Sequence, residues 1–417
     1  MRNTSRAKFF AVAAVLSLTA VACSDDEKSD STTSAAETTT GESTETTTAE
    51  TTGETMAPVD GLPSTSGDTA AKVMVITDET QGQIAYSAPE TYQAVQLALE
   101  GFPNVEVSVC DAKGDQNEYL NCQQKAIDEG VNAVVIGWSA GGQAGDDALY
   151  EAGIPVLGGG ATIDDLAYSF ASGSGSYVGL GAGAVEAGGK KIGVLYLEGT
   201  DQLVDAIERG VKLKGGEVVS RAAIPNNAPD LAPAIAKLLG DGSDLIILSV
   251  SPPTVVQAMT AIDATGEDVM VACVSAILPQ ALLDYLGPLS EGMIAIATTL
   301  NSAEDGKAMA ELGEGVERIK PGTALTTQTA LGFLSGYVLA TAFANIDGEV
   351  NTESLVAALD AIDNLDLGGL VGPVSTKPLN SDGLQRYMNP YAIVFKVEGL
   401  KLVKQSDFID VRAAFEG

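Results

Sequence analysis

From Lys72 onward, short apolar runs alternate with segments of helical periodicity. The apolar runs predict strands over residues 72–77, 105–110, 131–136, 154–157, 191–197, 217–219, 244–250, 269–271 and 292–297. The intervening segments predict helices over residues 89–99, 120–129, 145–152, 202–213, 230–239, 253–265 and 279–286. Regular alternation of strand and helix is typical of βαβ units and a parallel sheet.

The pattern restarts after a region rich in Gly and Ser over residues 168–189, and the second series mirrors the first. We therefore expect two similar α/β lobes with a seam near Gly188–Gly189. The C-terminal part does not repeat the pattern. It predicts helices over 323–343 and 352–362, followed by a β-hairpin over 391–403. Thr, Gln and Ser in the first half of 323–343 favour a buried core helix over a membrane span.

The N-terminus has the pattern of an export signal. Three basic residues precede an apolar run over residues 9–18, and small residues lead to Cys23. A basic region followed by a short apolar region predicts a signal peptide over residues 1–22. Its end, Ala-Val-Ala-Cys, resembles a bacterial lipobox, which implies a lipid on Cys23. The alternative is ordinary cleavage near Ala22 that leaves an incidental thiol.

Residues 23–70 are rich in Thr, Ser and Glu and poor in apolar residues. Such a segment cannot bury enough apolar surface to offset the entropy lost on ordering. We expect a disordered tether between the anchor and the folded part.

Composition restricts the chemistry. The chain of 417 residues has no histidine and a formal net charge of −33. Without histidine, neither Ser-His-Asp nor Cys-His catalysis is available, and histidine metal ligands are excluded. The acid excess argues against nucleic acid and anionic membrane surfaces as direct partners. We expect no nucleic-acid partner, and membrane contact only through the lipid anchor.

The cysteines suggest a structural role. Cys110 and Cys122 flank a polar loop between the second strand and its helix, in a chain with an export signal. We predict a disulfide worth about 3 kcal/mol in the chain-entropy model; two separate thiols are the alternative. Cys273 follows a buried strand and is expected to be a packed free thiol. No Cys-x-x-Cys pair is present, so zinc and thioredoxin chemistry have no support. We expect no metal site and no cofactor.

The third strand ends in Gly137-Trp138-Ser139-Ala140-Gly141, which matches the Gly-x-Ser-x-Gly nucleophile elbow. No histidine is available to activate Ser139 as a nucleophile. The alternative is that small residues let backbone N–H groups approach a ligand at the carboxyl edge of the sheet. We therefore expect Trp138, Ser139 and Ala140 to bind a ligand rather than to catalyse a reaction.

Acidic residues elsewhere have two interpretations. The pairs Asp146–Asp147 and Asp164–Asp165 are predicted to cap helices and to complement helix dipoles. Glu198 follows the first strand of the second lobe, where it either faces the expected cleft or is a solvated loop acid. Both interpretations of Glu198 stay open.

Several segments are similar to those of a known family: residues 109–111, 130–137, 152–156, 190–196, 336–343 and 353–359. Together with the export signal and the two serial α/β lobes, they resemble type I periplasmic solute-binding proteins. The nearest branch is the leucine/isoleucine/valine-binding family of ABC transporter receptors, over residues 72–417.

The resemblance implies an α/β fold of two Rossmann-like lobes with parallel sheets, a multi-crossing hinge and a ligand cleft between the lobes. It assigns lobe 1 to residues 72–188 plus 298–373, and lobe 2 to residues 189–297 plus 374–417.

In that family, serines after the third strand and an Ala-x-Thr turn after the fourth hold the polar groups of an amino acid. Ser139 matches the first loosely, and Gly160-Ala161-Thr162 matches the second with glycine in place of alanine. The tyrosine and glutamate that clamp the α-ammonium are absent near Gly199 and Ser275, and Glu198 is the candidate substitute. The expected ligand-binding residues are Tyr86, Trp138, Ser139, Ala140, Gly160, Thr162, Glu198 and Ser275.

The resemblance thus implies a monomeric, non-catalytic solute receptor of an ABC importer, lipid-anchored at the cell surface or in the periplasm. It would capture an amino acid or a related polar compound by lobe closure and deliver it to permease subunits. Two alternatives stay open. One is a sugar receptor in which Trp138 or Tyr86 stacks on a pyranose, and the other is a non-transport sensor or adhesive lipoprotein.

Overall fold

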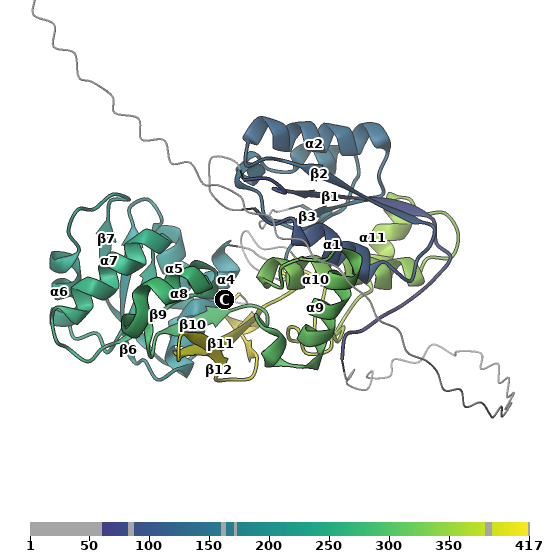
Figure 1. Cartoon of the computed structure of the whole chain (residues 1–417). Coiled ribbons are helices and arrows are strands. Elements are labelled where there is room, and N and C mark those ends of the chain that lie inside the picture. Colours follow the sequence, from purple (N-terminus) through teal and green to yellow (C-terminus); the bar gives the residue numbers. More distant parts are fainter. Residues whose placement is uncertain (1–60, 82–86, 160–163, 171–172, 380–385, 416–417) are drawn as a thin grey trace, which may run out of the picture. The chain divides into compact units, whose positions relative to one another are not determined.

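The computed structural model describes residues 61–81, 87–159, 164–170, 173–379 and 386–415. They form two α/β lobes, each built on one sheet (Figure 1). The first sheet has the order β2-β1-β3-β4-β5, and the second has the order β12-β11-β10-β9-β8-β6-β7, with β13 paired to β11. The expected α/β class with parallel-dominated sheets and two lobes is confirmed.

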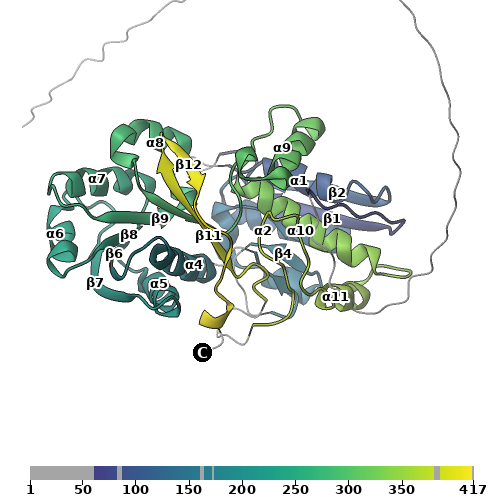
Figure 2. The ribbon, with the colours of Figure 1, turned by 90° about the horizontal axis from the view of Figure 1, so that it is seen from below.

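All neighbouring strands of the first sheet are parallel. They are β1 (Ala71–Thr77), β2 (Val105–Asp111), β3 (Ala133–Ile136), β4 (Val156–Gly158) and β5 (Ala167–Tyr168). The helices of this lobe are α1 (Glu90–Ala98), α2 (Gln116–Glu129), α3 (Asp147–Glu151), α9 (Lys307–Ile319), α10 (Thr327–Ala344) and α11 (Thr352–Asp360). Figures 1 and 2 show α9 and α10 beside α1.

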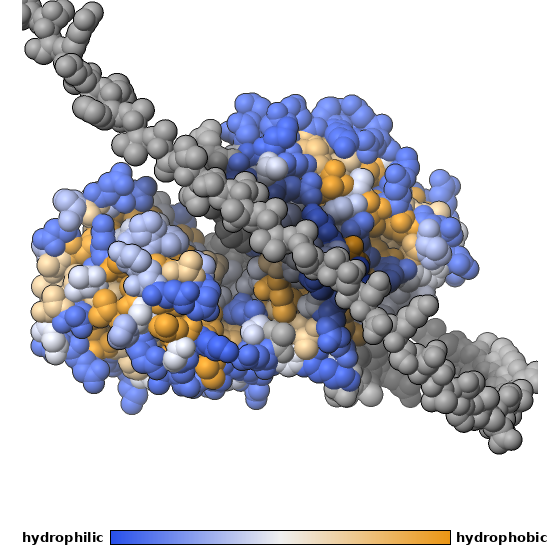
Figure 3. Space-filling model, viewed as in Figure 1, coloured by the Kyte–Doolittle hydropathy of each residue, from blue (hydrophilic) through white to orange (hydrophobic). Residues whose placement is uncertain are grey.

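Both faces of the central strands β1 and β3 are buried, which explains their continuous apolar runs. Along β1, Val73 and Val75 belong to the core that includes Phe333 of α10. Met74 and Ile76 point to the opposite face, into the core that α2 and α3 cover. The outer side of α2 is mostly hydrophilic (Figure 3).

The second sheet is parallel from β7 to β10 and ends in an antiparallel hairpin. Its strands are β6 (Lys191–Leu197), β7 (Glu217–Ile224), β8 (Leu245–Ser249), β9 (Met270–Val274), β10 (Ile294–Ala297), β11 (Tyr391–Glu398), β12 (Lys401–Lys404) and β13 (Ile409–Asp410). Its helices are α4 (Gly173–Glu186), α5 (Asp201–Leu213), α6 (Ala232–Gly240), α7 (Pro252–Asp263) and α8 (Gln280–Leu286). Short 3₁₀ helices are η1 (Ala140–Ala144), η2 (Ser275–Ile277), η3 (Gly287–Ser290), η4 (Ala303–Asp305) and η5 (Arg412–Ala414).

Helix α4 occupies the Gly- and Ser-rich region where the sequence predicted no element. It packs against α5, β10 and β11 of the second sheet, whereas the predicted seam at Gly188–Gly189 placed it in the first lobe (Figure 2). The glycines serve close packing, because a Cβ added to Gly181 would lie 2.1 Å from the carbonyl oxygen of Ile207. A Cβ at Gly210 would lie 1.9 Å from the carbonyl oxygen of Val178. The glycine content therefore hid this helix from the sequence-based prediction.

Two other helices differ from the sequence-based expectation. Helix α9 was not predicted at all. Helix α2 begins at Gln116 rather than at residue 120, because the side chain of Asp115 caps it by accepting from the backbone N–H groups of Asn117 and Glu118.

Residues 61–70, which the sequence assigned to the disordered tether, pack on the first lobe. Leu62 donates its backbone N–H to Glu311 Oε2 at 2.6 Å, and Thr69 Oγ1 donates to the carbonyl of Phe343 at 2.9 Å. The tether prediction is therefore wrong for these ten positions, and its remainder lies outside the described residues. So does the predicted signal peptide. No helix in the described part of the chain has the length and apolar character needed to cross a membrane.

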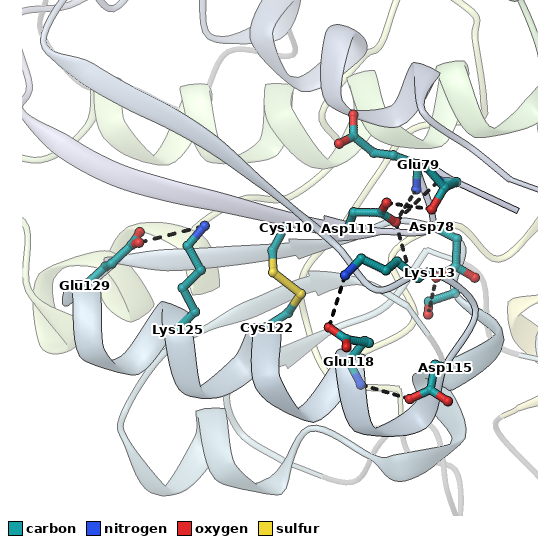
Figure 4. The surroundings of a disulfide bond; sticks show 12 residues. Asp78, Glu79, Cys110, Asp111, Lys113, Asp115, Glu118, Cys122, Lys125 and Glu129 are labelled. Atoms are coloured by element: carbon teal, nitrogen blue, oxygen red, sulfur yellow. Dashed lines mark hydrogen bonds and ion pairs between the residues drawn. A yellow bond between two sulfur atoms is a disulfide. The ribbon is translucent and has the colours of Figure 1, made fainter. Parts of the chain in front are cut away.

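The predicted disulfide is present. Cys110 of β2 and Cys122 of α2 are bonded, with their Cα atoms 5.7 Å apart (Figure 4). The predicted packed thiol of Cys273 is confirmed, since it is fully buried and burial raises its pKa.

Candidate functional site

A cavity of about 370 Å³ opens at the carboxyl edge of the first sheet. Its lining comes from the ends of β3 and β4, from helices α1, α2 and α10, and from the segment after β5. The lining residues are Thr91, Tyr119, Ile136, Gly137, Trp138, Ser139, Gly142, Asp146, Gly158, Gly159, Phe170, Gln328, Leu331, Gly332 and Ser335. Open α/β sheets bind ligands at this edge.

A second cavity, of about 510 Å³, lies at the opposite edge of the other sheet. The amino ends of β9 and β10 form it, with Asp268, Met270 and Met293 in its wall. Among the described residues, its lining contains no aromatic side chain and no residue that follows the carboxyl end of a parallel strand. The first-sheet cavity is therefore the candidate site.

Asp78 holds the loop that carries Trp138 and Ser139. This carboxylate follows β1 and is fully buried. Ser139 Oγ donates to its Oδ1 at 2.9 Å, and the backbone N–H of Ala140 donates to its Oδ2 at 2.9 Å. The backbone N–H of Asp78 in turn donates to the carbonyl of Trp138 at 3.0 Å. The loop is thus fixed to the neighbouring strand before any ligand arrives.

The two glycines of the Gly-Trp-Ser-Ala-Gly loop permit close contact with neighbouring protein. A Cβ on Gly137 would lie 2.6 Å from Thr77 Oγ1, and one on Gly141 would lie 2.6 Å from the carbonyl oxygen of Asp115. Ser139 itself has φ −143° and ψ 131°, which is ordinary extended backbone. A nucleophile elbow places its serine on a strained turn. The match to that motif is therefore one of sequence and not of geometry.

Asp146 is a second buried carboxylate in the cavity wall. Tyr119 Oη and Gln123 Nε2 both donate to its Oδ1, at 2.6 and 3.0 Å. Burial raises the pKa of Asp146, while these two hydrogen bonds oppose the rise. The sequence predicted Asp146 as a helix cap, but its side chain makes no capping hydrogen bond to α3. Asp146 does occupy the N-cap position of α3, and Asp147 lies in its first turn, as predicted. The side-chain cap is missing because Tyr119 and Gln123 of α2 bond to the carboxylate instead.

The helix-cap prediction is wrong for the other acidic pair, Asp164–Asp165. Asp164 Oδ1 accepts from the backbone N–H of Leu166 at 2.8 Å, within a turn that precedes β5. The Oδ1 atom of Asp165 lies 3.7 Å from Nη1 of Arg386. Neither residue begins a described helix.

Thr91 lies where α1 meets α10 and the end of β3. It is 1% exposed, and its Oγ1 has no hydrogen-bond partner among the described residues. The methyl group of Thr91 fits between two glycines, because a Cβ on Gly137 or on Gly332 would lie 3.0 or 3.1 Å from Thr91 Cγ2. Its hydroxyl is therefore a polar group in the cavity wall that the described protein leaves unsatisfied.

The structure brings only some of the predicted site residues together. Trp138 and Ser139 line the cavity, and Ala140 begins η1 behind them. Glu198 and Ser275 follow β6 and β9 at the carboxyl edge of the second sheet; Glu198 is exposed and Ser275 is half-buried. Tyr86, Gly160, Thr162 and Cys23 lie outside the described residues.

Sequence reasoning missed Asp78, Thr91, Tyr119, Phe170 and the residues of α10 that line the cavity. Asp78 carried a usable signal, because it directly follows a predicted parallel strand. The helix residues carried none, since an apolar or small side chain gives no hint of the wall it forms. Within the described ranges, no group of three His, Cys, Asp or Glu residues converges as metal ligands would.

Comparison with solved structures identifies the fold. The chain is similar to a leucine binding protein from Thermotoga maritima, with a TM-score of 0.63 and 17% identity over 82% of this chain and 100% of that one. It is similar to a fatty acid ABC transporter substrate-binding protein from Thermomonospora curvata, with a TM-score of 0.64 and 16% identity over 85% and 97% of the two chains. A third is the solute binding protein of an ABC transporter from Rhodopseudomonas palustris in complex with 3,4-dihydroxybenzoic acid, with a TM-score of 0.62 and 20% identity over 82% and 98%.

The TM-scores show the fold, which is that of type I periplasmic binding proteins. No curated protein sequence matches the chain. The sequence model of the periplasmic binding protein family matches residues 70–394, which is most of the chain and includes the first sheet and the parallel strands of the second. The chain belongs to the periplasmic binding protein family.

Proposed function

We propose that this protein is an extracytoplasmic solute receptor that captures a small molecule in the first-sheet cavity and delivers it to the permease of an ABC transporter. The observation that carries the proposal is a cavity of about 370 Å³ at the carboxyl edge of a parallel sheet. That volume lies in the usual range for small-molecule sites. Trp138 and Phe170 give the cavity aromatic walls, which suit a solute with an apolar part.

The receptor is proposed to have no catalytic activity at Ser139. The hydroxyl hydrogen of Ser139 already bonds to a carboxylate, and the chain has no histidine that could act as its base. The test is the turnover of activated esters by the wild-type chain and by Ser139→Ala. Turnover that the substitution abolishes would overturn this part of the proposal.

We further propose a lipid anchor on Cys23, which holds the receptor at the cell surface or in the periplasm as a monomer. The support is the lipobox-like sequence before Cys23. The experiment compares the membrane fraction of wild type with that of Cys23→Ala. Release of the variant into the soluble extracytoplasmic fraction is expected, and unchanged membrane retention would contradict the anchor.

The ligand is proposed to be an amino acid or another small compound with both polar and apolar parts. The named ligands of the similar structures differ widely, from leucine to a dihydroxybenzoic acid. Capture between the lobes would add Glu198 and Ser275 to Trp138 and Ser139, with Tyr86, Gly160 and Thr162 as further candidates. The alternatives are a sugar ligand and a sensor or adhesive role without transport.

The test of the receptor is a thermal-shift screen of the exported full chain against amino acids, amines, sugars and organic acids. A ligand of the native state stabilises it by about 2.7 kcal/mol at a hundredfold excess over Kd. A hit should also change the fluorescence of Trp138, the only tryptophan in the chain. Uptake of the labelled hit with and without the permease genes separates a transport receptor from a sensor. The absence of any thermal shift across the whole panel would overturn the proposed function.

A further inference from the structure

Several hydrogen-bond donors at the edge of the cavity are already used within the protein. Ser139 Oγ and the backbone N–H of Ala140 donate to Asp78, and the backbone N–H of Gly141 donates to Ser139 Oγ at 3.1 Å. At the start of α10, Thr326 Oγ1 accepts from the backbone N–H groups of Gln328 and Thr329. A carboxylate ligand needs such donors, and at these two turns it would have to displace a protein acceptor to obtain them.

Three buried carboxylates surround this site. Asp78 is 0% exposed and supports the loop, Asp146 is 5% exposed and lines the cavity, and Glu90 is 5% exposed and adjoins Thr91. Glu90 Oε1 accepts from Thr326 Oγ1 at 2.7 Å, which ties it to the cap of α10. No lysine or arginine of the described residues forms an ion pair with any of the three.

Buried carboxylates normally have a positively charged partner or a metal ion. The cavity lining contains no lysine or arginine within the described residues, and these carboxylates do not converge as metal ligands. Both donors to Asp146 bond to the same oxygen, Oδ1, which leaves Oδ2 for another group. The Oγ1 of Thr91 also lacks a partner among the described residues. An ammonium group is a donor that either of these oxygens can accept.

We infer that the cavity selects an organic cation, an amine with an apolar or aromatic body, and discriminates against carboxylates of the same shape. This inference rests on the proposed function and names its ligand class. The ammonium group bonds to Asp146 Oδ2 and Thr91 Oγ1, and Trp138 and Phe170 enclose the apolar body. Aromatic faces also attract a cation directly. The acid excess of the chain, −33 in net charge, raises the local concentration of cations.

The experiment is calorimetric titration of the exported full chain with two matched series of probes. One series is benzylamine, benzyl alcohol and benzoate, and the other is isopentylamine, isopentanol and isovalerate. At least one amine should bind tenfold or more tighter than its alcohol, and a hundredfold or more tighter than its carboxylate. Equal or tighter binding of the carboxylate overturns the inference, as does the absence of binding by both amines.

Asp146→Asn should weaken binding of the amine at least tenfold and bring its affinity close to that of the alcohol. Asp147→Asn is the matched control, because it removes the same charge from the next residue, which is exposed. It should change affinity less than twofold. Equal losses of amine affinity in both variants would mean that only the overall negative potential of the protein attracts the amine, and would overturn the role of Asp146. If Asp146→Asn does not fold, Glu90→Gln replaces it, since glutamine can still accept from Thr326; two- to fivefold weaker amine binding is then expected, and unchanged binding contradicts the inference.

The outcomes separate the inference from the function on which it rests. Binding of leucine, a fatty acid or a hydroxybenzoate without any binding of amines leaves the receptor standing and overturns the cation preference. Absence of binding by every compound of the broad screen overturns the receptor itself.

Discussion

Ser139→Ala tests the central hydrogen-bonded loop of the site. The substitution removes the 2.9 Å hydrogen bond from Ser139 Oγ to the buried carboxylate of Asp78. A hydrogen bond to a charged group contributes about 1.5–3 kcal/mol. It also removes the acceptor of the Gly141 backbone N–H, and a buried donor left unsatisfied costs about 1–3 kcal/mol. Because water from the cavity can replace part of the loss, we expect the free energy of unfolding to fall by about 2–4 kcal/mol.

The assay is urea unfolding monitored by the fluorescence of Trp138. This residue is the only tryptophan and adjoins Ser139, so the signal reports the unfolding of the first lobe. Ser335→Ala is the matched control, since it removes a hydroxyl from the wall of the same cavity without affecting Asp78. It should stay within about 1 kcal/mol of wild type, because alanine is a better helix former than serine at this position in α10.

The result that would refute the reasoning is a midpoint for Ser139→Ala that coincides with that of Ser335→Ala at equal urea dependence. The hydrogen bond to Asp78 would then contribute nothing, and the loop would owe its shape to packing around Gly137 and Gly141. A double-mutant cycle with Asp78→Ala separates the coupling energy between Ser139 and Asp78 from the stability gained by removing a buried charge. A coupling energy of about 1.5–3 kcal/mol is expected.

Three further predictions concern the scaffold. Replacing Cys110 and Cys122 together by alanine should lower the free energy of unfolding by about 3 kcal/mol, measured by urea unfolding, because the disulfide closes a separation of 12 residues; no loss would refute the entropic account. Burial raises the pKa of Asp146, so the folded chain binds that proton more tightly than the unfolded chain, and ionisation costs stability as the pH rises above about 4. Asp146→Asn should therefore gain stability relative to wild type between pH 4 and 7 in thermal melts, and a constant difference would contradict the raised pKa. Gly210→Ala should destabilise the folded chain by about 2 kcal/mol or more in the same melts, because its Cβ would lie 1.9 Å from a carbonyl oxygen of α4. Gly240→Ala is the control, because no atom lies within 4 Å of its Cβ, and it should be neutral or slightly stabilising.

Hydrophobic periodicity predicted most of the fold because strand and helix alternate regularly and both faces of strands β1 and β3 are buried. The same reasoning failed for α4, where glycines usually signal turns. In this helix Gly181 lies against the backbone of α5, and a contact with a distant segment leaves no local trace in the sequence. It also failed at residues 61–70, which are held by hydrogen bonds from the Leu62 backbone N–H to α9 and from the Thr69 hydroxyl to α10.

The candidate site could be predicted in position but not in its chemistry. The rule that ligands bind at the carboxyl ends of parallel strands pointed to Trp138 and Ser139, and both line the cavity. The rule could not show whether the hydrogen-bond donors of this loop are already used within the protein. From the sequence, Ser139 and Ala140 looked free to donate hydrogen bonds to a ligand, because no residue near them in the sequence competes for their hydrogens.

The group that accepts these hydrogens is the carboxylate of Asp78, 61 residues before Ser139 in the sequence. Asp78 follows β1, which pairs with β3 in parallel register, so the ends of the two strands lie side by side and the carboxylate meets the loop. This single contact changes the electrostatic character of the site, since it uses the donors that an anion would need and adds a buried negative charge behind them. A loop whose sequence suggests free backbone donors thus becomes, in the folded chain, part of an acceptor-rich wall, and the ligand that suits such a wall is a donor.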